Sequence, residues 1–405
     1  MEGILKGVRV LDLGRFIACP YCGLLLAAMG AEVIQVKRPG EREEVFLPFQ
    51  FDPWPYFSVA YGANKKGITL DLMHEQGRQV FKELVRKCDV VLENFSIDVA
   101  KAMGLDYEAL KEVNPGIILV AITGFGQYGP YASRLAFDAI GQALSGAMMA
   151  TGFADGPPLR SGVNFVDYGT ALYAALGTVS ALYHREKTGK GQLVDVSLVD
   201  TAVSFRGTVF AFYKLFNWIA PRLGNRSPFH VYNCYKTKDG WVFLAVITNR
   251  LWRRLAEVMG QEELAVDPRF ATDAARCENI DVLHSIVGEW MEGKTVAEVI
   301  SLMEEAQIPC SPVYDIPDVL DDPHIRAREM IVDIDYPGLG RVPLTGFPIK
   351  FSETPGNIAT RGPDLGEHNE EIYCGLLGFS REELAEIMAL TVEGKQALDR
   401  IIGPH

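Results

Sequence analysis

The sequence predicts an α/β protein, with a large domain built on a parallel sheet and a second, smaller α+β domain. Three observations support this fold class. Short apolar runs alternate with segments of helical spacing through the first third of the chain, a pattern typical of repeated βα units. The chain has 405 residues, more than one small domain usually holds. Its 48% hydrophobic and 22% charged residues are those of an ordinary globular protein.

The first βαβ unit comprises the strand Val8–Leu13, a helix at Pro20–Met29 and the strand Glu32–Lys37. The pattern continues with a strand at Ile68–Leu72, a helix at Glu75–Lys87, a strand at Asp89–Glu93, a helix at Asp106–Val113 and a strand at Gly116–Thr123. Strands joined in this way form a parallel sheet covered on both faces. Ligands of such sheets bind beyond the carboxyl ends of the strands.

The rest of the chain divides by composition. Residues 136–150 and 168–186 are Ala-rich and Gly-rich helices, and Gln192–Leu198 is a strand. We expect a large domain at 1–200, a linker at 201–224, a small domain at 225–325, and a return to the large domain at 326–405. Within the last two segments we expect a hairpin at Tyr232–Val246, helices at 250–260, 279–292 and 295–306, a strand at Val342–Phe351 and a helix at 381–390.

Composition also restricts the binding partners and the cellular compartment that we expect. The net charge of −13 argues against nucleic acid or an anionic membrane as a partner. No run of 18 apolar residues occurs, and the opening MEGILKGVRV lacks the pattern of a secretory signal, so we expect a cytoplasmic protein. Seven scattered cysteines and seven isolated histidines predict reduced thiols and no metal site.

The stretch FIACPYCG contains Cys-Pro-Tyr-Cys, the dithiol motif of glutaredoxins, after a strand and at the head of a helix. A helix N-terminus can lower a thiol pKa, so a redox role for Cys19 and Cys22 is chemically reasonable. The chain lacks the rest of a thioredoxin-type layout, and four-residue motifs recur by chance. Two thiols at a packed helix start are the simpler interpretation.

The end of the second strand indicates what kind of nucleotide could bind. The turn Leu13–Ala18 lacks the Gly-x-Gly-x-x-Gly of dinucleotide sites, and Lys37-Arg38 stands where those sites carry an acidic residue. Cations there suit a ribose phosphate, such as the 3′-phosphate of coenzyme A. The alternative is that Lys37, Arg38 and Arg42 form a solvated run of charge.

Asp167 is the only charged residue between Arg160 and His184, and it precedes a helix of small residues. One interpretation is structural, because aspartate is a favoured helix N-cap. The other is functional. Small neighbours such as Gly169 would leave room for a ligand, and a desolvated carboxylate can attack an acyl group.

A family resemblance covers the chain from Leu5 to about Leu377. It rests on collinear blocks around Asp167, none of which is specific alone: GVRVLDLGRFIACP, MGAEVIQVKRPG, NKKGITLDL, DVVLENF, MGLDYEAL, NPGIILVAITGFGQYGPY, FDAIGQALSG, TGKGQLVDVSLVD, RLGNR, DGW and LGEHN. The chain resembles the class III CoA-transferases, which include formyl-CoA transferase and carnitine CoA-transferase. The resemblance implies a Rossmann-like large domain, a smaller domain, and an interlocked, ring-like dimer.

The resemblance also implies site residues. The nucleophilic aspartate of the family falls on Asp167, and Asp138 matches an acidic position near the reacting thioester. The CoA-contacting positions match Ile17, Ala18, Arg38, Leu70, Asp71, Leu72, Met73, Asn94, Phe95, Ser96, Lys101 and Arg134. Many relatives have Arg where this chain has Ala102, so the contact at Lys101 departs from the family pattern. Only Ala18 and Pro20 keep that pattern in the CPYC stretch, which makes its cysteines expected bystanders.

The reaction implied is transfer of CoA from an acyl-CoA to a free carboxylic acid, with no tightly bound cofactor and no metal. Asp167 would pass through an aspartyl anhydride and an aspartyl-CoA thioester. One alternative is an α-methylacyl-CoA racemase, which uses a histidine where this chain has Phe137, a residue that cannot exchange a proton. Another is a subunit that needs a related partner chain, so both a homodimer and a heteromer remain open.

Aromatic and basic residues after the linker's start suggest which acids could react. The segments 210–225 and Phe229–Tyr235 are rich in aromatic residues. They favour an aromatic or bulky acceptor such as a benzylsuccinate, with succinyl-CoA as donor. The alternative is that these rings form a core. Arg222 or Arg226 could bind the second carboxylate of a dicarboxylic acid.

Overall fold

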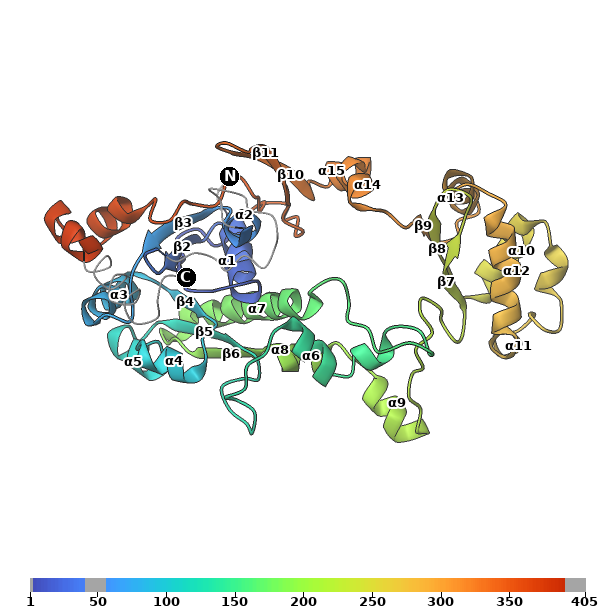
Figure 1. Cartoon of the computed structure of the whole chain (residues 1–405), viewed down its shortest axis with the longest axis horizontal. Helices are drawn as coiled ribbons and strands as arrows, with labels where there is room; N and C mark the ends of the chain where they lie inside the picture. Colours follow the sequence, from blue (N-terminus) through green and yellow to red (C-terminus); the bar gives the residue numbers. More distant parts are fainter. Residues whose placement is uncertain (1–2, 41–55, 390–405) are drawn as a thin grey trace. The chain divides into compact units, whose positions relative to one another are not determined.

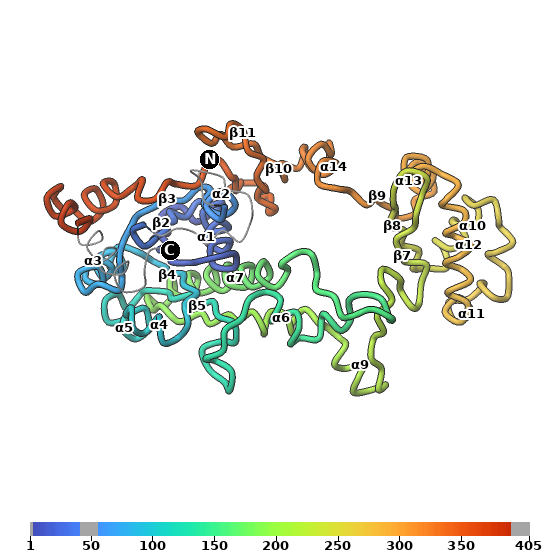
Figure 2. The backbone as a smooth tube through the Cα atoms, viewed as in Figure 1, coloured from blue at the N-terminus to red at the C-terminus, as the bar shows by residue number. Residues whose placement is uncertain are grey.

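The computed structural model describes residues 3–40 and 56–389. The described chain forms two units (Figure 1). Unit 1 comprises the residues up to Ala147, Arg160–Phe212 and the residues from His324 onward, and unit 2 comprises Met148–Leu159 and Tyr213–Pro323. The blue N-terminal and the orange-red C-terminal parts of the chain both belong to unit 1 (Figure 2). Of the charge run discussed above, Arg42 lies outside the described residues.

A six-stranded sheet of parallel neighbours organises unit 1, in the order β3-β2-β1-β4-β5-β6. Its strands are β1 (Arg9–Asp12), β2 (Glu32–Lys37), β3 (Lys65–Thr69), β4 (Val90–Glu93), β5 (Ile118–Thr123) and β6 (Leu193–Ser197). The strands β2 and β3 lie on one side of β1, and β4, β5 and β6 lie on the other, so the strand order reverses at β1. That reversal opens a crevice beyond the carboxyl ends of β1 and β4, where α/β proteins bind ligands.

The third strand differs from the prediction at Ile68–Leu72, because β3 spans Lys65–Thr69 and residues 70–73 form a loop. Leu70 still donates its N–H to the Lys37 carbonyl, at 2.9 Å. Asp71 Oδ1 then accepts the N–H of Met73 at 3.0 Å, a local turn that replaces strand pairing. Similarly, the strand expected at Val342–Phe351 is β11 (Gly340–Thr345), paired antiparallel with β10 (Ile331–Tyr336).

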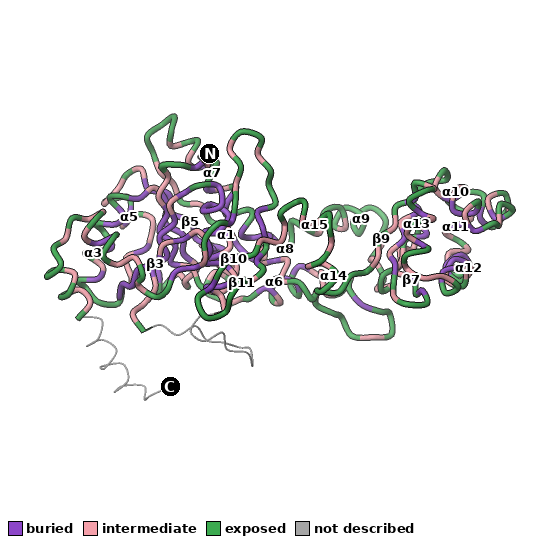
Figure 3. Tube along the Cα trace, turned by 90° about the horizontal axis from the view of Figure 1, so that it is seen from above, coloured by how far each residue is buried: buried purple, intermediate pink, exposed green. Residues whose placement is uncertain are grey.

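Helices cover both faces of the sheet, and alternate strand residues point into two cores. On one face, α1 (Ala18–Ala28) and α7 (Phe165–Thr188) pack on residues such as Val10 and Val33. On the other, α3 (Glu75–Lys87), α4 (Ile97–Ala102) and α5 (Tyr107–Val113) pack on Leu11 and Ile34. Strands covered on both faces are mostly apolar, which explains the continuous apolar run of β5, Ile118–Thr123. The buried positions concentrate along these elements (Figure 3).

Unit 1 also contains several further short helices. They are α2 (Tyr56–Tyr61), α6 (Asp138–Leu144), α8 (Leu198–Ser204), the π-helical turn η3 (Glu370–Leu376) and a helix over 381–389. The helix expected at 136–150 is therefore interrupted after Leu144, where Ser145 ends α6 and Gly146 adopts a φ of 78°. A left-handed glycine is a common way for a helix to end.

Unit 2 is an α+β unit with its own core. An antiparallel sheet orders β7 (Val231–Lys236), β8 (Trp241–Val246) and β9 (Cys310–Pro312). Its helices are α10 (Asn249–Met259), α11 (Asp273–Glu278), α12 (Ile280–Glu292), α13 (Val296–Glu305) and α14 (Ile316–Asp321), with short 3-10 turns η1 (Met148–Ala150) and η2 (Glu262–Ala265). Two elements, α9 (Val209–Phe216) and α15 (Pro323–Ala327), lie at the unit boundaries. Fully buried Trp252 and Phe270 are at the centre of this core.

Among the described residues, no helix combines the length and apolar character needed to cross a bilayer. The same residues also contain no group of three or more His, Cys, Asp or Glu side chains arranged to hold a metal ion.

Candidate active site

The start of α7 is capped from another helix. Asp138, the first residue of α6, places Oδ2 at 2.8 Å from the backbone nitrogen of Val166 and 3.2 Å from that of Asp167. The N-cap residue of α7 itself, Asn164, makes no side-chain capping bond. A carboxylate that accepts the first N–H groups of a helix also interacts favourably with the helix dipole. Asp167 therefore lies inside the first turn of α7 and is not its N-cap.

Asp138, and not Asp167, supplies the carboxylate that accepts the first N–H groups of α7. Burial, and to a smaller extent the neighbouring Asp138 carboxylate, together raise the pKa of Asp167 to about 7. Both effects disfavour the ionised form, because removal from water and a nearby like charge each penalise a carboxylate. A carboxyl group with a pKa near neutrality is typical of functional sites.

Asp138 is held by a second set of contacts. Its Oδ1 accepts a hydrogen bond from Gln142 Nε2, and Gln142 Oε1 accepts the Ser161 backbone N–H at 2.9 Å. Both side chains are buried, with exposed fractions of 5% for Asp138 and 1% for Gln142. This network fixes the loop before α7 to α6, and so fixes the position of Asp167.

Gly169 does not provide ligand space. A Cβ atom at this position would lie 2.4 Å from Phe205 Cε2 and 3.1 Å from Thr201 Cγ2. The space beside this glycine is therefore filled by α8 and the residue after it. The expectation that Gly169 leaves room for a ligand is wrong, and the glycine instead permits close packing of α7 against α8.

Two phenols lie beside Asp167. The hydroxyl oxygens of Tyr61 and Tyr168 are 2.9 Å apart, and the Tyr21 ring packs edge-on against Tyr168 at 5.0 Å between centroids. Burial, the Tyr168 hydroxyl and the charge of Asp167 all raise the pKa of Tyr61. These three tyrosines come from α1, α2 and α7, so they join the helices next to Asp167.

A cavity of about 500 Å³ opens at the carboxyl ends of β1 to β4. The lining residues come from the end of β2, from the turns that follow the strands, and from α1, α2 and the α4 region: Leu13, Gly14, Arg15, Phe16, Pro20, Gln35, Val36, Lys37, Arg38, Phe57, Leu70, Asp71, Leu72, Met73, Phe95, Val99 and Met103. Six of the positions matched by resemblance are therefore brought together at this cavity: Arg38, Leu70, Asp71, Leu72, Met73 and Phe95.

The cavity has basic side chains on one part of its wall. Arg38 Nε donates to Asp71 Oδ2 at 3.3 Å, and Lys37 Nζ donates to Ser58 Oγ at 2.8 Å. Arg15 adds a third cation to the lining. Apolar walls with a few basic groups can accept a ligand that has both an apolar arm and phosphates.

The other matched positions do not line this cavity. Ile17 and Ala18 lie at the head of α1, and Ser96 is the N-cap of α4. Asn94 acts on the neighbouring turn: its Oδ1 accepts the Arg15 N–H at 2.9 Å and its Nδ2 donates to the Arg15 carbonyl at 2.8 Å. Lys101 is exposed on α4, and the Arg134 guanidinium lies 3.8 Å from the centre of the Tyr131 ring.

Three aromatic residues connect the cavity to α6. Phe16 and Phe57 line the cavity, and the Phe16 ring packs edge-on against Phe57 at 6.0 Å and against Phe137 at 5.4 Å. Phe137 directly precedes Asp138. Phe16 has a φ of 63°, an unusual backbone conformation for a bulky residue. Sequence patterns did not indicate Arg15, Phe16 or Phe57 as lining residues. The place of Arg15 and Phe16 in the first strand–helix turn could have signalled them, whereas no sequence pattern marks Phe57.

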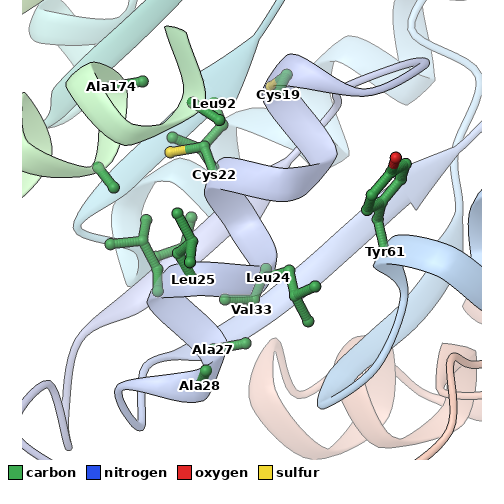
Figure 4. Close-up of a cluster of buried hydrophobic side chains, with 14 of the residues drawn as sticks. Cys19, Cys22, Leu24, Leu25, Ala27, Ala28, Val33, Tyr61, Leu92 and Ala174 are labelled. Carbon is green, nitrogen blue, oxygen red and sulfur yellow. The ribbon is translucent and has the colours of Figure 1, made fainter. Parts of the chain in front are cut away.

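The two cysteines of the CPYC stretch are fully buried on α1 (Figure 4). Burial and the nearby Asp12 carboxylate raise the pKa of both thiols. Beneath the turn, Lys65 Nζ contacts Asp12 Oδ2 at 2.7 Å, and both side chains are completely buried. A dithiol redox centre needs an accessible thiol with a lowered pKa, so this environment does not suit one.

The arginines and aromatic residues considered for binding the acceptor acid are Arg222, Arg226 and the rings of segments 210–225 and Phe229–Tyr235. Arg222 donates to the Phe153, Ala154 and Gly156 carbonyls, and Arg226 pairs with Asp281. The aromatic residues of α9 are not core residues, because no residue of this helix is buried. The alternative that the aromatic rings form a core is therefore wrong for α9. It holds for Tyr235, which is buried.

Comparisons with known proteins find similarity over nearly the whole chain. A family model described as CoA-transferase family III matches residues 5–369. Succinyl-CoA–D-citramalate CoA-transferase of Chloroflexus aurantiacus is 38% identical over 392 residues, which cover 96% of this chain and 98% of the relative. The beta subunit of succinyl-CoA–L-malate CoA-transferase of the same organism is 35% identical over 399 residues, covering 96% and 98%. A CAIB/BAIF family protein from Brucella suis superposes with a TM-score of 0.83 at 33% identity, covering 93% and 100%.

Proposed function

Because this chain belongs to CoA-transferase family III and is a CoA-transferase, we propose that Asp167 is its covalent nucleophile. We further propose that the enzyme moves CoA from succinyl-CoA to a free dicarboxylic acid. The observation that carries the first proposal is the side chain of Asp167, which is not needed as a helix cap and has a pKa raised to about 7. Support for the second comes from the relatives whose names specify succinyl-CoA, D-citramalate and L-malate.

The proposed reaction begins with attack by an Asp167 carboxylate oxygen on the carbonyl carbon of the acyl-CoA. The carbon–sulfur bond breaks, CoA leaves as a thiolate, and a mixed anhydride remains on Asp167. The thiolate then attacks the aspartyl carbonyl, and the donor acid leaves as a carboxylate from an aspartyl-CoA thioester. Dividing an acyl exchange into such steps is the advantage of covalent catalysis.

The second half reverses the first with another acid. The incoming carboxylate attacks the aspartyl-CoA carbonyl, which expels the thiolate and forms a new anhydride. The thiolate attacks the acyl carbonyl of that anhydride, so the new acyl-CoA leaves and the Asp167 carboxylate is regenerated. Only the ionised form of Asp167 can start this sequence, so its raised pKa limits the rate in acid.

CoA is proposed to occupy the cavity at the carboxyl ends of β1 to β4. Its apolar walls suit the pantetheine arm, and Arg15, Lys37 and Arg38 supply positive charge for phosphates. The aromatic contacts from Phe16 to Phe137 lead from this cavity toward the helix that caps α7. The matched positions outside the cavity, including Lys101 and Arg134, remain proposed contacts for the parts of CoA that extend beyond it.

An aromatic dicarboxylic acid such as benzylsuccinate is the second candidate acceptor. The observation in its favour is the ring cluster Phe16, Phe57 and Phe137, two members of which line the cavity. Racemisation is less well supported, because Phe137 offers no proton. In addition, both Asp138 oxygens already accept hydrogen bonds.

A second copy of the chain is the proposed partner. One side of α7 exposes large apolar residues at helical spacing: Leu172, Tyr173, Leu176, Val179 and Tyr183. Monomeric proteins rarely expose such a continuous apolar stripe. An interlocked homodimer would cover it, and a heteromer is the alternative because one relative is named as a beta subunit. Light scattering of the purified chain decides between a homodimer and a monomer that awaits another subunit.

The test of the proposed reaction uses acyl-CoA donors and free acids in all pairs. The panel contains succinyl-CoA and acetyl-CoA with D-citramalate, L-malate, benzylsuccinate and acetate. We expect transfer from succinyl-CoA to a dicarboxylate and none in Asp167→Ala, whereas Asp155→Ala, at an exposed carboxylate, keeps full activity. Undiminished transfer by Asp167→Ala would refute the nucleophile. Exchange of an α-proton without transfer would favour the racemase.

A further inference from the structure

The edge of the main sheet is covered by the C-terminal part of unit 1. β3 is the last strand on its side of the sheet, and the segment from Asn357 to Tyr373 runs along its open edge (Figure 1). An uncovered edge strand would leave its outward N–H and C=O groups without protein partners. The covering segment contains the LGEHN sequence, Leu365–Asn369, which the proposed chemistry does not use.

Two neighbouring residues of LGEHN contact alternate positions of β3. Gly67 donates its N–H to His368 Nδ1 at 3.1 Å, and its carbonyl accepts the His368 N–H at 2.9 Å. Asn369 Oδ1 accepts the Thr69 N–H at 2.9 Å, and Asn369 Nδ2 donates to Thr69 Oγ1 at 3.0 Å. LGEHN thus replaces a seventh strand with two side chains and one backbone group.

The approach is close and leaves no space for another residue at position 67. A Cβ atom on Gly67 would lie 2.8 Å from Pro363 Cγ and 3.1 Å from the Asp364 carbonyl oxygen. A third contact follows at the strand end, where the Tyr373 hydroxyl donates to the Thr69 carbonyl at 2.8 Å. His368, Asn369 and Tyr373 together form what we call the edge clamp.

The clamped strand leads directly into the cavity wall. Thr69 is followed by Leu70–Met73, all of which line the cavity, and Asp71 contacts Arg38 across it. The clamp bonds to both the N–H and the carbonyl of Thr69, so it sets where the 70–73 loop leaves the sheet. The loop is also held by the bond from Leu70 to Lys37 and by the Asp71 turn. At its far end, Arg78 Nη1 donates to the Leu72 carbonyl at 3.2 Å and to the Met73 carbonyl at 2.9 Å. The clamp therefore acts at the end of the loop that leaves β3.

We propose that the edge clamp positions the 70–73 loop and thereby sets the affinity of the cavity for CoA. This inference rests on the proposed CoA site. The clamp residues do not touch the cavity, so they act as positioning residues through β3. Because their bonds are to β3, whereas the proposed nucleophile is on α7, their loss changes CoA binding and leaves the chemical step largely intact.

The experiment measures CoA binding by calorimetry on the full chain, together with hydrogen–deuterium exchange of residues 65–73. His368→Leu removes the acceptor for Gly67, and Tyr373→Phe removes the donor to Thr69. His368→Asn is the conservative variant, because an asparagine Oδ1 can occupy the place of Nδ1. Glu370→Ala is the matched control, since Glu370 lies in the same segment and pairs with Arg381.

We expect His368→Leu and Tyr373→Phe to raise the Kd for CoA about tenfold, as the loss of one or two hydrogen bonds implies. Exchange at 65–73 rises in both, kcat at saturating acyl-CoA stays within about twofold, and His368→Asn restores the affinity. Faster exchange with an unchanged Kd would overturn the inference and leave LGEHN as an edge cover only. Absence of CoA binding by the unaltered chain would instead refute the CoA site itself.

Discussion

Asp138 Oδ2 accepts the backbone N–H of Asp167 at 3.2 Å, so the two carboxyl groups that matter most are joined through the first turn of one helix. Asp138 caps α7 and contributes negative charge next to Asp167. Asp138 therefore both positions the proposed nucleophile and, through its negative charge, helps to keep the pKa of Asp167 high.

Replacing Asp138 by Asn tests this coupling through the pH profile. For the unaltered enzyme, kcat/KM should rise with pH with a midpoint at about 7, because the ionised Asp167 attacks. Asp138→Asn removes the nearby negative charge, which favours ionisation of Asp167, so the midpoint shifts to lower pH. The maximum also falls, because the amide lacks the charge that favours the N-terminus of α7, and its nitrogen cannot accept the hydrogen bond from Gln142.

Gln142→Ala is the control for that experiment. It removes a hydrogen bond to Asp138 but leaves the charge in place. We expect lower activity with an unmoved midpoint. A midpoint that stays near 7 in Asp138→Asn would mean that burial alone raises the Asp167 pKa.

Asp167→Asn should abolish transfer and yet stabilise the fold at high pH. The folded pKa of Asp167 is raised to about 7, so the unfolded chain ionises at lower pH and stability is lost as pH rises toward 7. The amide does not ionise and avoids this loss. The variant should melt about 2–4 °C above the unaltered chain at pH 8, with a smaller gap at pH 5. Equal melting temperatures at pH 8 would contradict a buried, raised carboxyl.

The buried pair of Lys65 and Asp12 should be sensitive to removal of one partner. Lys65→Met leaves the Asp12 charge buried without its cation, which typically costs about 3–5 kcal/mol in the free energy of unfolding. Denaturant unfolding, followed by a probe in unit 1, measures the cost. Asp12→Asn combined with Lys65→Met should recover part of it. A single variant as stable as the unaltered chain would show that the pair contributes no net stability.

Cys19 and Cys22 should resist alkylation in the folded enzyme. Both are fully buried and their thiol pKa values are raised, whereas Cys234, Cys277, Cys310 and Cys374 are partly exposed. Iodoacetamide at pH 8 followed by peptide mapping should label the partly exposed group first. CoA transfer by Cys19→Ala and Cys22→Ala should stay close to normal. Rapid labelling of Cys19 with loss of activity would revive the redox interpretation.

The sequence was informative where the signal is local. The apolar run Ile118–Thr123 corresponds to a central strand because a sheet covered on both faces favours apolar residues along its inner strands. Asp167 stood out because it is an isolated charge among small residues. Its resemblance to a known motif then suggested its role, which remains a proposal.

Contacts between distant segments were not predictable in this way. The bonds from Asp138 to α7 cross 28 residues, and the bond from Gly67 to His368 crosses 301. No periodicity or spacing encodes such pairs. The left-handed backbone of Phe16 was equally hidden, because that conformation normally signals glycine. Gly169 was misjudged for a related reason: a small residue can admit a ligand or a neighbouring ring, and here Phe205 fills the space.

The most direct measurement traps the enzyme during turnover. The full chain is mixed with succinyl-CoA and a dicarboxylic acid, quenched with hydroxylamine or borohydride, and mapped by peptide mass spectrometry. The account predicts a hydroxamate or reduced side chain at Asp167, and none in Asp167→Asn. Active enzyme whose Asp167 peptide stays unmodified under these conditions would contradict it.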